Sequence, residues 1–274
     1  MKKIAIQGIK GSNHHIVARN YYGDNILLDE CLSFDALVDS ILTKKSDQAI
    51  MAIENTIAGS IISNYALLDT YNLHIVGEQY LNIHHHLMAL KNQSIEDITE
   101  IYSHPMALLQ CKEFFKKYKN IKLIEDVDTA DVAKRISEGN LKGIAAIAPK
   151  IASEIYELEV INDKIQTITN NATRFVIVQT NNPKNGIASI NKASLKFELD
   201  HKRGSLAAIL NVVSDCNLNL TKIQSLPKIE TLWKYAFFVD VTFNNYKDYK
   251  KAKSLLAIMA TNFKVLGEYK NGRI

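Results

Sequence analysis

The sequence is poor in cysteine and has neither a long apolar run nor a basic segment. Its three cysteines, Cys31, Cys111 and Cys216, are odd in number, far apart and without paired spacing. This pattern argues against a disulfide framework or a zinc site and favours buried or half-buried thiols in a reducing compartment. No stretch could span a membrane, and the apolar residues after Lys3 are too few for the core of a signal peptide. We therefore expect a cytoplasmic protein with no membrane partner.

The charge balance argues against a second class, the nucleic-acid-binding proteins. The 33 basic and 29 acidic side chains leave a formal net charge of +4, and no basic run is interleaved with aromatic residues. Low-complexity segments and short repeats are also absent. What remains is a chain of 274 residues with 47% hydrophobic and 23% charged content. These values are typical of a soluble globular protein of about two domains.

Up to about residue 180, short apolar runs alternate with longer helix-like stretches. The expected strands are Ile4–Ile6, Ile26–Leu28, Ala49–Ile53, Leu73–Val76, Glu100–Tyr102, Ile121–Ile124 and Ile144–Ile147. The clearest expected helices are Phe34–Leu42, Ala107–Tyr118 and Ala130–Ser137. This alternation predicts parallel sheets covered by helices, the α/β class.

The rhythm changes between residues 76 and 90, where two strand-like stretches, His74–Tyr80 and His85–Leu90, follow each other without a helix. We interpret this as a crossing from one α/β lobe to another, with a return near Glu157–Thr169. The first lobe is then about 1–77 and 160–180, and the second about 78–159. Two lobes joined by two crossings form a cleft, which is a favoured place for a ligand.

Residues 181–190 are rich in turn formers and predict a linker. Beyond it, residues 191–274 follow the order βαββαβ of a ferredoxin-like domain. The expected elements are Ala193–Leu199, Gly204–Asp215, Leu218–Ser225, Leu232–Val241, Tyr246–Met259 and Lys264–Tyr269.

Four polar segments are candidates for a site: three follow expected strands, where open α/β sheets bind ligands, and the fourth leads into the expected apolar strand Val176-Ile177-Val178. They are Gly8-Ile9-Lys10-Gly11-Ser12, Glu54-Asn55-Thr56-Ile57-Ala58-Gly59-Ser60, Ser103-His104-Pro105 and Asn170-Asn171-Ala172-Thr173-Arg174-Phe175. Ser12 and Ser103 are also expected to cap helices, with Pro105 in the first turn of the second helix. Taken singly, each segment is more often a turn or a cap than a site.

Thr173 and Arg174 suggest a chemistry. A threonine does not ionise at neutral pH, so Thr173 would donate a hydrogen bond or relay a proton, whereas Arg174 stays charged and can hold a carboxylate in a bidentate grip. A substrate that loses a hydroxyl and carries carboxylates suits this pair.

Taken together, the four segments match the motifs of one known family. The chain resembles the prephenate dehydratase family with a C-terminal ACT regulatory domain, over nearly its whole length. The most specific motifs are Glu54-Asn55-Thr56 with Gly59-Ser60, Ser103-His104-Pro105 with Gln110-Cys111, Asp128-Thr129-Ala130, and Asn171-Ala172-Thr173-Arg174-Phe175. The resemblance implies a two-lobed catalytic domain at 1–180, similar to periplasmic binding proteins, followed by the ACT domain.

The resemblance also implies the reaction, in which prephenate loses carbon dioxide and its hydroxyl and becomes phenylpyruvate. Thr173 would assist departure of the hydroxyl, Arg174 would orient a carboxylate, and Glu54 or an ordered water would supply the proton. The residues implied to line the substrate site are Gly11, Ser12, Asn55, Thr56, Ser103, Gln110 and Phe175. His85 matches a family histidine that we interpret as structural. No metal or organic cofactor is implied.

The chain departs from the family pattern in two places. In the first loop Ile9, Ser12 and Asn13 replace a proline, a threonine and an aromatic residue, so that wall of the pocket differs. In the regulatory part, Gly204, Leu206, Asn219 and Leu220 match ACT motifs, but Gln224-Ser225-Leu226-Pro227 stands where the family has Glu-Ser-Arg-Pro. Binding of L-phenylalanine, feedback inhibition and a homodimer or homotetramer are the expectations.

Other interpretations stay open. Within the same class, the chain could be an arogenate dehydratase. Outside it, a non-catalytic two-lobed ligand-binding regulator has the same architecture. His84 and His86 share a strand spacing but have no carboxylate or cysteine at ligand spacing, so a hydrogen-bonded or solvated role is favoured over a metal site.

Overall fold

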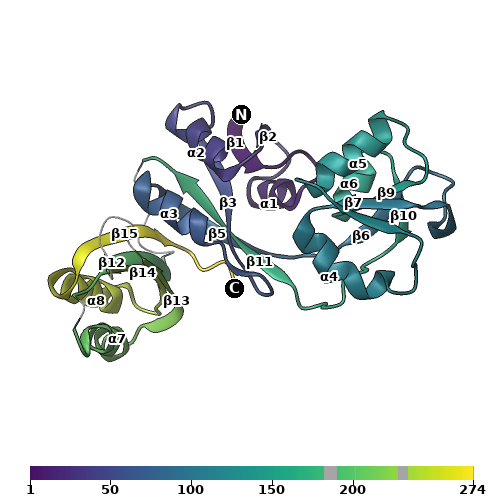
Figure 1. The fold of residues 1–274 in the computed structure, drawn as a ribbon. Coiled ribbons are helices and arrows are strands. Elements are labelled where there is room, and N and C mark those ends of the chain that lie inside the picture. The colour runs from purple at the N-terminus through teal and green to yellow at the C-terminus, as the bar shows by residue number, and fades with distance from the viewer. Residues whose placement is uncertain (182–189, 201, 228–233, 274) are drawn as a thin grey trace. The chain divides into compact units, whose positions relative to one another are not determined.

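The structure is a computed structural model that describes residues 1–181, 190–200, 202–227 and 234–273 (Figure 1). Contacts between residues divide the chain into two compact units. Unit 1 comprises Met1–Gly59 and Tyr80–Phe175, and unit 2 comprises Ser60–Gln79 and Val176–Ile274. The predicted division into a catalytic part at 1–180, a linker at 181–190 and an ACT domain at 191–274 stays a prediction, and residues 182–189 of that linker lie outside the described residues.

Unit 1 begins with a parallel sheet, as the alternation of strands and helices predicts. Its strands are β1 (Lys2–Gln7), β2 (Ile26–Cys31) and β3 (Gln48–Asn55), and its helices are α1 (Asn13–Tyr22) and α2 (Phe34–Leu42). β1 lies between the other two strands, with Ile4 opposite Leu28 and Ile6 opposite Ile50. Six successive residues of β3 are buried, which is typical of a strand inside a covered parallel sheet.

The second sheet of unit 1 is mixed. Its order is β10-β6-β9-β7-β8, and the strands are β6 (His86–Ala89), β7 (Glu100–Ser103), β8 (Lys122–Glu125), β9 (Ile144–Ala148) and β10 (Glu159–Asn162). β7 is parallel to β8 and β9, as predicted, but β6 is antiparallel to β9 and β10. The expectation of purely parallel sheets is therefore wrong for the strands through which the chain enters and leaves this lobe.

Helices cover both faces of this second sheet. They are α4 (Pro105–Phe115), α5 (Thr129–Glu138) and the short α6 (Lys150–Ile155), with a 3-10 turn, η1 (Ile95–Asp97), before β7. Because side chains alternate along a strand, Leu87 packs in the core under α4, whereas its neighbour Met88 packs in the core under α5. In Figure 1, α4 and α5 accordingly lie on different sides of β9.

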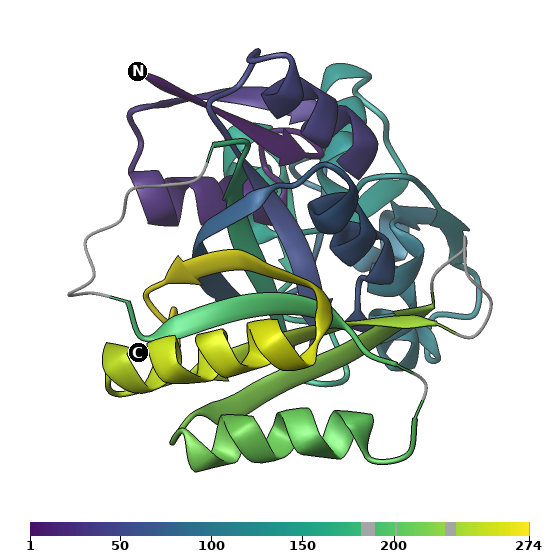
Figure 2. The same cartoon turned by 90° about the vertical axis from the view of Figure 1, so that its left-hand side faces the viewer.

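Unit 2 contains the predicted order βαββαβ. The six elements are β12 (Lys192–Glu198), α7 (Ser205–Asp215), β13 (Asn219–Pro227), β14 (Tyr235–Thr242), α8 (Tyr246–Met259) and β15 (Thr261–Tyr269). The strands form an antiparallel sheet in the order β13-β14-β12-β15, and Figure 2 shows α7 and α8 together on one face. The first two residues of the expected strand Leu232–Val241 lie outside the described residues.

The other elements complete the chain. They are β4 (Gly59–Ser60), α3 (Ile62–Thr70), β5 (His74–Asn82) and β11 (Ala172–Gln179), and the boundary between the two units falls within β5 and β11. β15 pairs with β5 at Gly267 and Ile75. A Cβ on Gly267 would lie 2.2 Å from the carbonyl oxygen of Ile75, so only glycine permits this pairing.

The two faces of the βαββαβ sheet bury different kinds of side chain. Ala193, Leu195 and Phe197 of β12 belong to the apolar core with α7 and α8. The alternate residues Lys192 and Lys196 are also buried, but they form ion pairs with acidic side chains of β5 and α3. The second face of this sheet therefore buries charged side chains of β12 together with the ring of Phe238, which packs against Tyr65 of α3.

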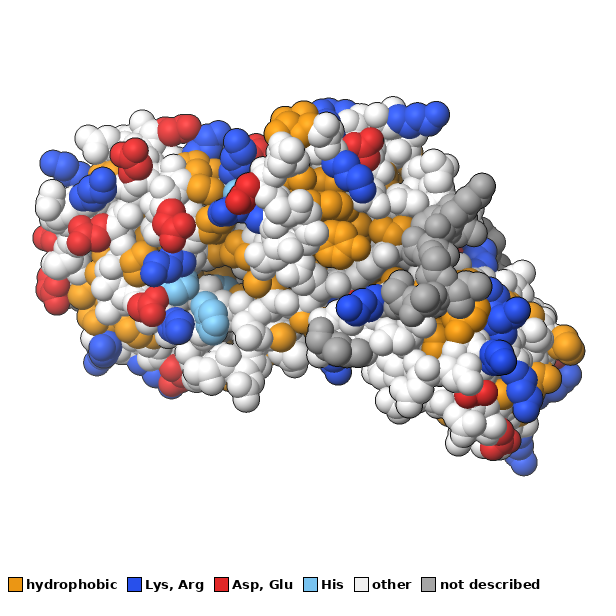
Figure 3. Space-filling view, turned by 180° about the vertical axis from the view of Figure 1, so that it is seen from behind, with side chains coloured by type: hydrophobic (Ala, Val, Ile, Leu, Met, Phe, Trp, Pro, Cys, Tyr) orange, Lys and Arg blue, Asp and Glu red, His pale blue; other side chains and the backbone are white. Residues whose placement is uncertain are grey.

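Other findings concern the described residues as a whole. No helix in them is long and apolar enough to cross a membrane, and they contain no cluster of three or more His, Cys, Asp or Glu side chains that could hold a metal ion. Cys31, Cys111 and Cys216 are buried free thiols, as predicted. On the face shown in Figure 3, basic and acidic side chains are interspersed.

Candidate active site

The turn after β3 fixes the side chain of Asn55. The backbone N–H groups of Ile57 and Ala58 each donate to Asn55 Oδ1 over 2.9 Å. This is the local hydrogen bonding that asparagine favours in turns. With Oδ1 held by backbone donors, the amide nitrogen must point away from the turn.

Asn55 Nδ2 donates to side chains at the start of β11. Its distances are 2.9 Å to Thr173 Oγ1 and 2.7 Å to Asn171 Oδ1. The neighbouring Thr56 joins the same segments, because its N–H donates to the carbonyl of Ala172 and its hydroxyl oxygen accepts from the N–H of Ala172. The second and fourth predicted segments therefore meet, although more than 110 residues separate them.

Gln110 extends the group from α4. Asn171 Nδ2 donates to Gln110 Oε1 over 2.8 Å, and the ring nitrogen Nε2 of His85 lies 2.8 Å from the same oxygen. Three predicted site residues, Asn55, Gln110 and Thr173, thus belong to one hydrogen-bonded chain. Asn171, which connects Asn55 with Gln110, and His85, at the end of the series, were not predicted to line the site, although Asn171 opens the motif that contains Thr173.

The first residues of β11 point to alternate faces of the strand. Thr173 faces Asn55, and Arg174, which is 4% exposed, therefore projects to the other face. Phe175 is buried beside the ring of His14, with 4.9 Å between the ring centroids in an edge-to-face arrangement. β11 begins at Ala172, ahead of the expected apolar stretch Val176–Val178, and its alternating side chains place Thr173 and Arg174 on different faces.

Ser103 lies at the end of β7 and is fully buried. Its hydroxyl donates to the carbonyl of Ile147 over 2.7 Å. The expectation that it caps α4 is wrong, because the N-cap is His104, whose Nδ1 accepts from the N–H of Met106. Pro105 occupies the first turn of the helix, as expected. Ser103 is committed to a strand-to-strand contact, which is why its hydroxyl does not reach the helix.

The first loop contacts the second lobe of unit 1. The hydroxyl of Tyr156 donates to the carbonyl of Lys10 over 2.7 Å, and a Cβ on Gly8 would lie 2.5 Å from Asp128 Oδ2. Asp128 caps α5, and burial raises the pKa of its carboxyl. The sequence singles out Asp128 as part of a motif but gives no sign of its contact with Gly8.

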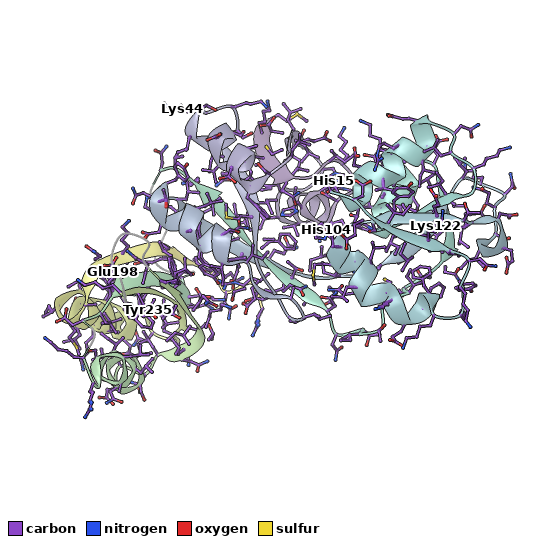
Figure 4. All side chains as sticks on the ribbon, in the orientation of Figure 1. His15, Lys44, His104, Lys122, Glu198 and Tyr235 are labelled. Atoms are coloured by element: carbon purple, nitrogen blue, oxygen red, sulfur yellow. The ribbon has the colours of Figure 1, made fainter. Side chains whose placement is uncertain are left out.

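Ser12 caps α1, as predicted, by accepting from the N–H of His15. In return, the N–H of Gly11 donates to His15 Nδ1 over 3.1 Å. Burial lowers the pKa of His15, which favours the neutral ring that this contact needs. His15 and His104 are labelled in Figure 4. The serine in place of the family threonine therefore keeps the cap.

Glu54 is the residue before Asn55 in β3 and is half-buried. Because side chains alternate along a strand, Glu54 and Asn55 face different sides. The predicted role of Glu54 as a proton source stays a prediction.

Comparison with protein families decides the assignment. The family model described as prephenate dehydratase matches residues 4–183. The chain belongs to this family.

Curated relatives support the same family. The bifunctional chorismate mutase/prephenate dehydratase of Buchnera aphidicola subsp. Acyrthosiphon pisum is 34% identical over 240 residues, which are 86% of this chain and 62% of that protein. The arogenate dehydratase/prephenate dehydratase 2 of Arabidopsis thaliana is 34% identical over 277 residues, which are 97% of this chain and 72% of the plant protein. The chain therefore spans less than two thirds of the Buchnera relative.

Solved structures share the fold over almost the whole chain. Prephenate dehydratase from Arthrobacter aurescens, in complex with L-Phe, aligns with a TM-score of 0.86 and 21% identity, covering 99% of this chain and 90% of its own. The enzyme from Staphylococcus aureus Mu50 aligns with 0.84 and 24%, covering 98% and 100%. GqqA, described as a quorum quenching acylase, aligns with 0.88 and 23%, covering 98% of each chain. Fold alone therefore does not fix the chemistry.

The residues predicted to form ACT motifs lie in unit 2. Gly204 has a φ of 82°, which favours glycine, and precedes α7, and Leu206 lines a pocket of about 180 Å³ with Tyr235, which Figure 4 labels. Asn219 and Leu220 begin β13. Among the described residues, neither of these two lines that pocket.

Proposed function

We propose that this chain catalyses the decarboxylating dehydration of prephenate to phenylpyruvate, on the route to L-phenylalanine. When the ring carboxylate leaves as carbon dioxide, the electron pair of the broken C–C bond enters the ring. The C–O bond at C4 then breaks, and the departing hydroxide takes up a proton to become water. Because the ring becomes aromatic, the driving force lies in the substrate. The protein must assist the leaving hydroxyl and hold the two carboxylates.

The observation that carries the proposal is the hydrogen bond from Asn55 to Thr173. Because Thr173 Oγ1 accepts from Asn55, its own hydroxyl hydrogen remains for a different acceptor. No acceptor for it is found among the described residues. A donor held in this way can stabilise the negative charge that develops on a departing oxygen. Threonine is a very weak acid, so Thr173 donates a hydrogen bond and an ordered water or Glu54 supplies the proton.

A dianionic substrate also needs donors for its carboxylates. Gln110 accepts two hydrogen bonds at Oε1, and this leaves its amide nitrogen to donate. We keep Arg174 as the proposed partner of the second carboxylate, which its guanidinium would reach from the face of β11 opposite Thr173. Gly11, Ser12 and Thr56 complete the proposed surroundings of the substrate. Ser103 and Phe175, which are buried, are proposed to shape the site from behind this layer. The reaction requires no metal or organic cofactor, because the ring itself receives the electron pair.

Arogenate is the second candidate substrate, since the Arabidopsis relative carries both activities in its name. Arogenate has an amino group where prephenate has a keto group, so its side chain bears a positive charge. An acidic side chain beside this group would favour arogenate, and a neutral or basic side chain there would favour prephenate. We assign prephenate as the preferred substrate.

We further propose that residues 191–274 form an ACT domain that binds L-phenylalanine. The pocket beside Leu206 supports this, because it combines the aromatic rings of Tyr235 and Phe237 with the charged pair Asp200 and Lys202. An aromatic amino acid has matching parts, an apolar ring and a zwitterionic end. Gln224-Ser225-Leu226-Pro227, which stands where the family has a charged motif, is not among the described residues that line this pocket.

The route from the ACT domain to the catalytic part is proposed to run through residues 60–79. Lys222 of β13 donates to Ser60 Oγ over 2.6 Å, and Ser60 directly follows the turn that holds Asn55. Lys196 and Lys264 both pair with Asp69 of α3. Effector binding could then alter the Asn55 turn by favouring one of two arrangements. We expect a cytoplasmic homodimer or homotetramer whose subunits pair through the ACT domain.

One experiment tests the proposed function. The purified chain is incubated separately with prephenate and with arogenate at neutral pH, and phenylpyruvate and phenylalanine are measured, with and without added L-phenylalanine. The proposal expects rapid conversion of prephenate, slow conversion of arogenate and inhibition by phenylalanine. Conversion of arogenate alone would favour the second candidate. Conversion of neither would leave a non-catalytic regulator.

A further inference from the structure

The hydrogen-bonded chain that ends at Thr173 has a direction that the backbone sets. Backbone N–H groups can only donate, so the two that contact Asn55 Oδ1 identify that atom as the carbonyl oxygen of the amide. Asn55 Nδ2 is therefore the donor in its contacts with Asn171, Thr173 and, over 3.4 Å, the carbonyl of Ala172. Its partner Asn171 must present Oδ1 to it, since two amide nitrogens cannot share a hydrogen bond.

The same reasoning continues along the chain. With Oδ1 turned towards Asn55, Asn171 presents Nδ2 to Gln110, so Gln110 must accept through Oε1. The ring nitrogen Nε2 of His85 contacts that same oxygen and must carry a hydrogen. The backbone of the Asn55 turn thus determines, through the three side-chain amides of Asn55, Asn171 and Gln110, which tautomer His85 adopts.

The surroundings of His85 agree with a neutral ring. Burial lowers the pKa of His85, and the neighbouring rings of His84 and His86 act in the same direction, against the hydrogen bond to Gln110. Its side chain is 5% exposed, and Nδ1 is buried without a hydrogen-bond partner among the described residues. An unprotonated Nδ1 is compatible with this environment, whereas a buried N–H there would lose a hydrogen bond.

The consequence for the substrate concerns the amide nitrogen of Gln110. Because Oε1 accepts from both His85 and Asn171, the Gln110 amide nitrogen is turned away from them and has no hydrogen-bond partner among the described residues. Gln110 is only partly buried, so this nitrogen is available to a ligand. If the amide were reversed, its carbonyl oxygen would face an anion and repel it.

We propose that His85, as the Nε2–H tautomer, is a positioning residue that orients Gln110 and, through Asn171 and Asn55, the hydroxyl of Thr173. This inference rests on the proposed function, since it assigns the donors that an anionic substrate would meet. His85 touches no reacting atom. It acts by making one of the two amide orientations of Gln110 the stable one.

Two matched substitutions separate positioning from packing. In His85→Gln, the side-chain amide nitrogen can reach the place of Nε2, whereas in His85→Asn it reaches only the place of Nδ1. We expect kcat/KM for prephenate to fall about tenfold in His85→Asn and to stay within about threefold of wild type in His85→Gln, the scale expected for loss of one neutral hydrogen bond. His86 is next to His85 but takes no part in the hydrogen bonds to Gln110, so His86→Gln should match wild type. Equal losses in both His85 variants would overturn the proposal.

A measurement on the free protein tests the tautomer of His85 without any turnover of substrate. The ¹⁵N spectrum of histidine-labelled protein, with the signal of His85 assigned by its loss in His85→Gln, reports which ring nitrogen carries the hydrogen. We expect Nε2 protonated and Nδ1 bare across the neutral pH range. An Nδ1–H tautomer or an imidazolium would overturn the proposal. The expected tautomer without conversion of prephenate would support the hydrogen-bonded chain and count against the proposed function alone.

Discussion

Asn55 donates to the hydroxyl oxygen of Thr173 over 2.9 Å, although 118 residues separate the two in the chain. In the proposed mechanism, this contact gives each residue a defined function. The turn that follows β3 immobilises Asn55, and Asn55 in turn leaves the hydrogen of Thr173 to donate. The arrangement is preorganised, so the donor does not need to be reoriented when negative charge develops on the leaving oxygen.

Substitution of Asn55 separates folding from catalysis. Asn55→Asp keeps an oxygen that can accept from Ile57 and Ala58, but it removes the donor to Thr173 and places a negative charge beside an anionic substrate. We expect kcat/KM to fall by roughly a hundredfold or more, with the melting temperature close to wild type. Asn55→Ala should lose both activity and stability, because the turn then lacks its acceptor. Steady-state kinetics and thermal unfolding of the two variants test this difference.

Asp128 gives a prediction about pH. Burial raises the pKa of its carboxyl, so the folded protein holds this proton more tightly than the unfolded chain does. The contribution of Asp128 to stability is therefore present at low pH and is lost as the pH rises through the folded pKa. Asp128→Asn can still cap α5, because an amide oxygen can accept from Ala130 and Asp131.

We therefore expect Asp128→Asn to be more stable than wild type at neutral pH, with the difference shrinking as the pH falls through the acid range. Urea unfolding of both proteins over a series of pH values measures this difference, and all other groups cancel in the comparison. A difference that does not change with pH would contradict the assignment.

The buried ion pair of unit 2 predicts a large loss of stability. Lys192 Nζ lies 2.9 Å from both carboxylate oxygens of Glu78, and their side chains are 3% and 0% exposed. Lys192→Met leaves a buried carboxylate without its cation, which we expect to cost about 3–5 kcal/mol in the free energy of unfolding. The double variant Lys192→Met with Glu78→Gln should recover part of this loss. Chemical denaturation checks both, and a double variant that is less stable than Lys192→Met would contradict the account.

Lys222 tests the proposed regulatory route. Lys222→Met removes the hydrogen bond to Ser60 Oγ but leaves the pocket residues intact. We expect inhibition by L-phenylalanine to weaken roughly five- to tenfold, whereas the uninhibited kcat stays within about twofold of wild type. Lys247→Met, on the exposed part of α8, is the control. Calorimetry should show that phenylalanine still binds. Unchanged inhibition in Lys222→Met would exclude this route.

Much of the architecture could be predicted from the sequence because its signals are local. Phe34–Leu42 and Tyr246–Met259 were expected as helices with these bounds, and Ser33 and Asn245 cap them. The order βαββαβ also follows from local periodicity and turn residues. These features depend on neighbours within a few positions of the chain.

The features that could not be predicted depend on contacts between distant segments. Ser103 resembles a helix cap in the sequence, but its hydroxyl donates to Ile147 of a neighbouring strand. β6 is antiparallel to its neighbours, which its short apolar sequence does not reveal. His85 was interpreted as structural, because only the spatial order of Asn55, Asn171 and Gln110 shows what its ring contacts.

The most direct test of the account is the turnover of prephenate by Thr173→Val, which keeps the shape of the side chain but removes the hydroxyl. Thr173→Ser, which keeps the hydroxyl, is the matched control. We expect kcat for phenylpyruvate formation to fall by roughly a hundredfold to a thousandfold in Thr173→Val, with little change in KM, and to be largely retained in Thr173→Ser. A Thr173→Val variant that turns prephenate over at the wild-type rate would contradict the central claim.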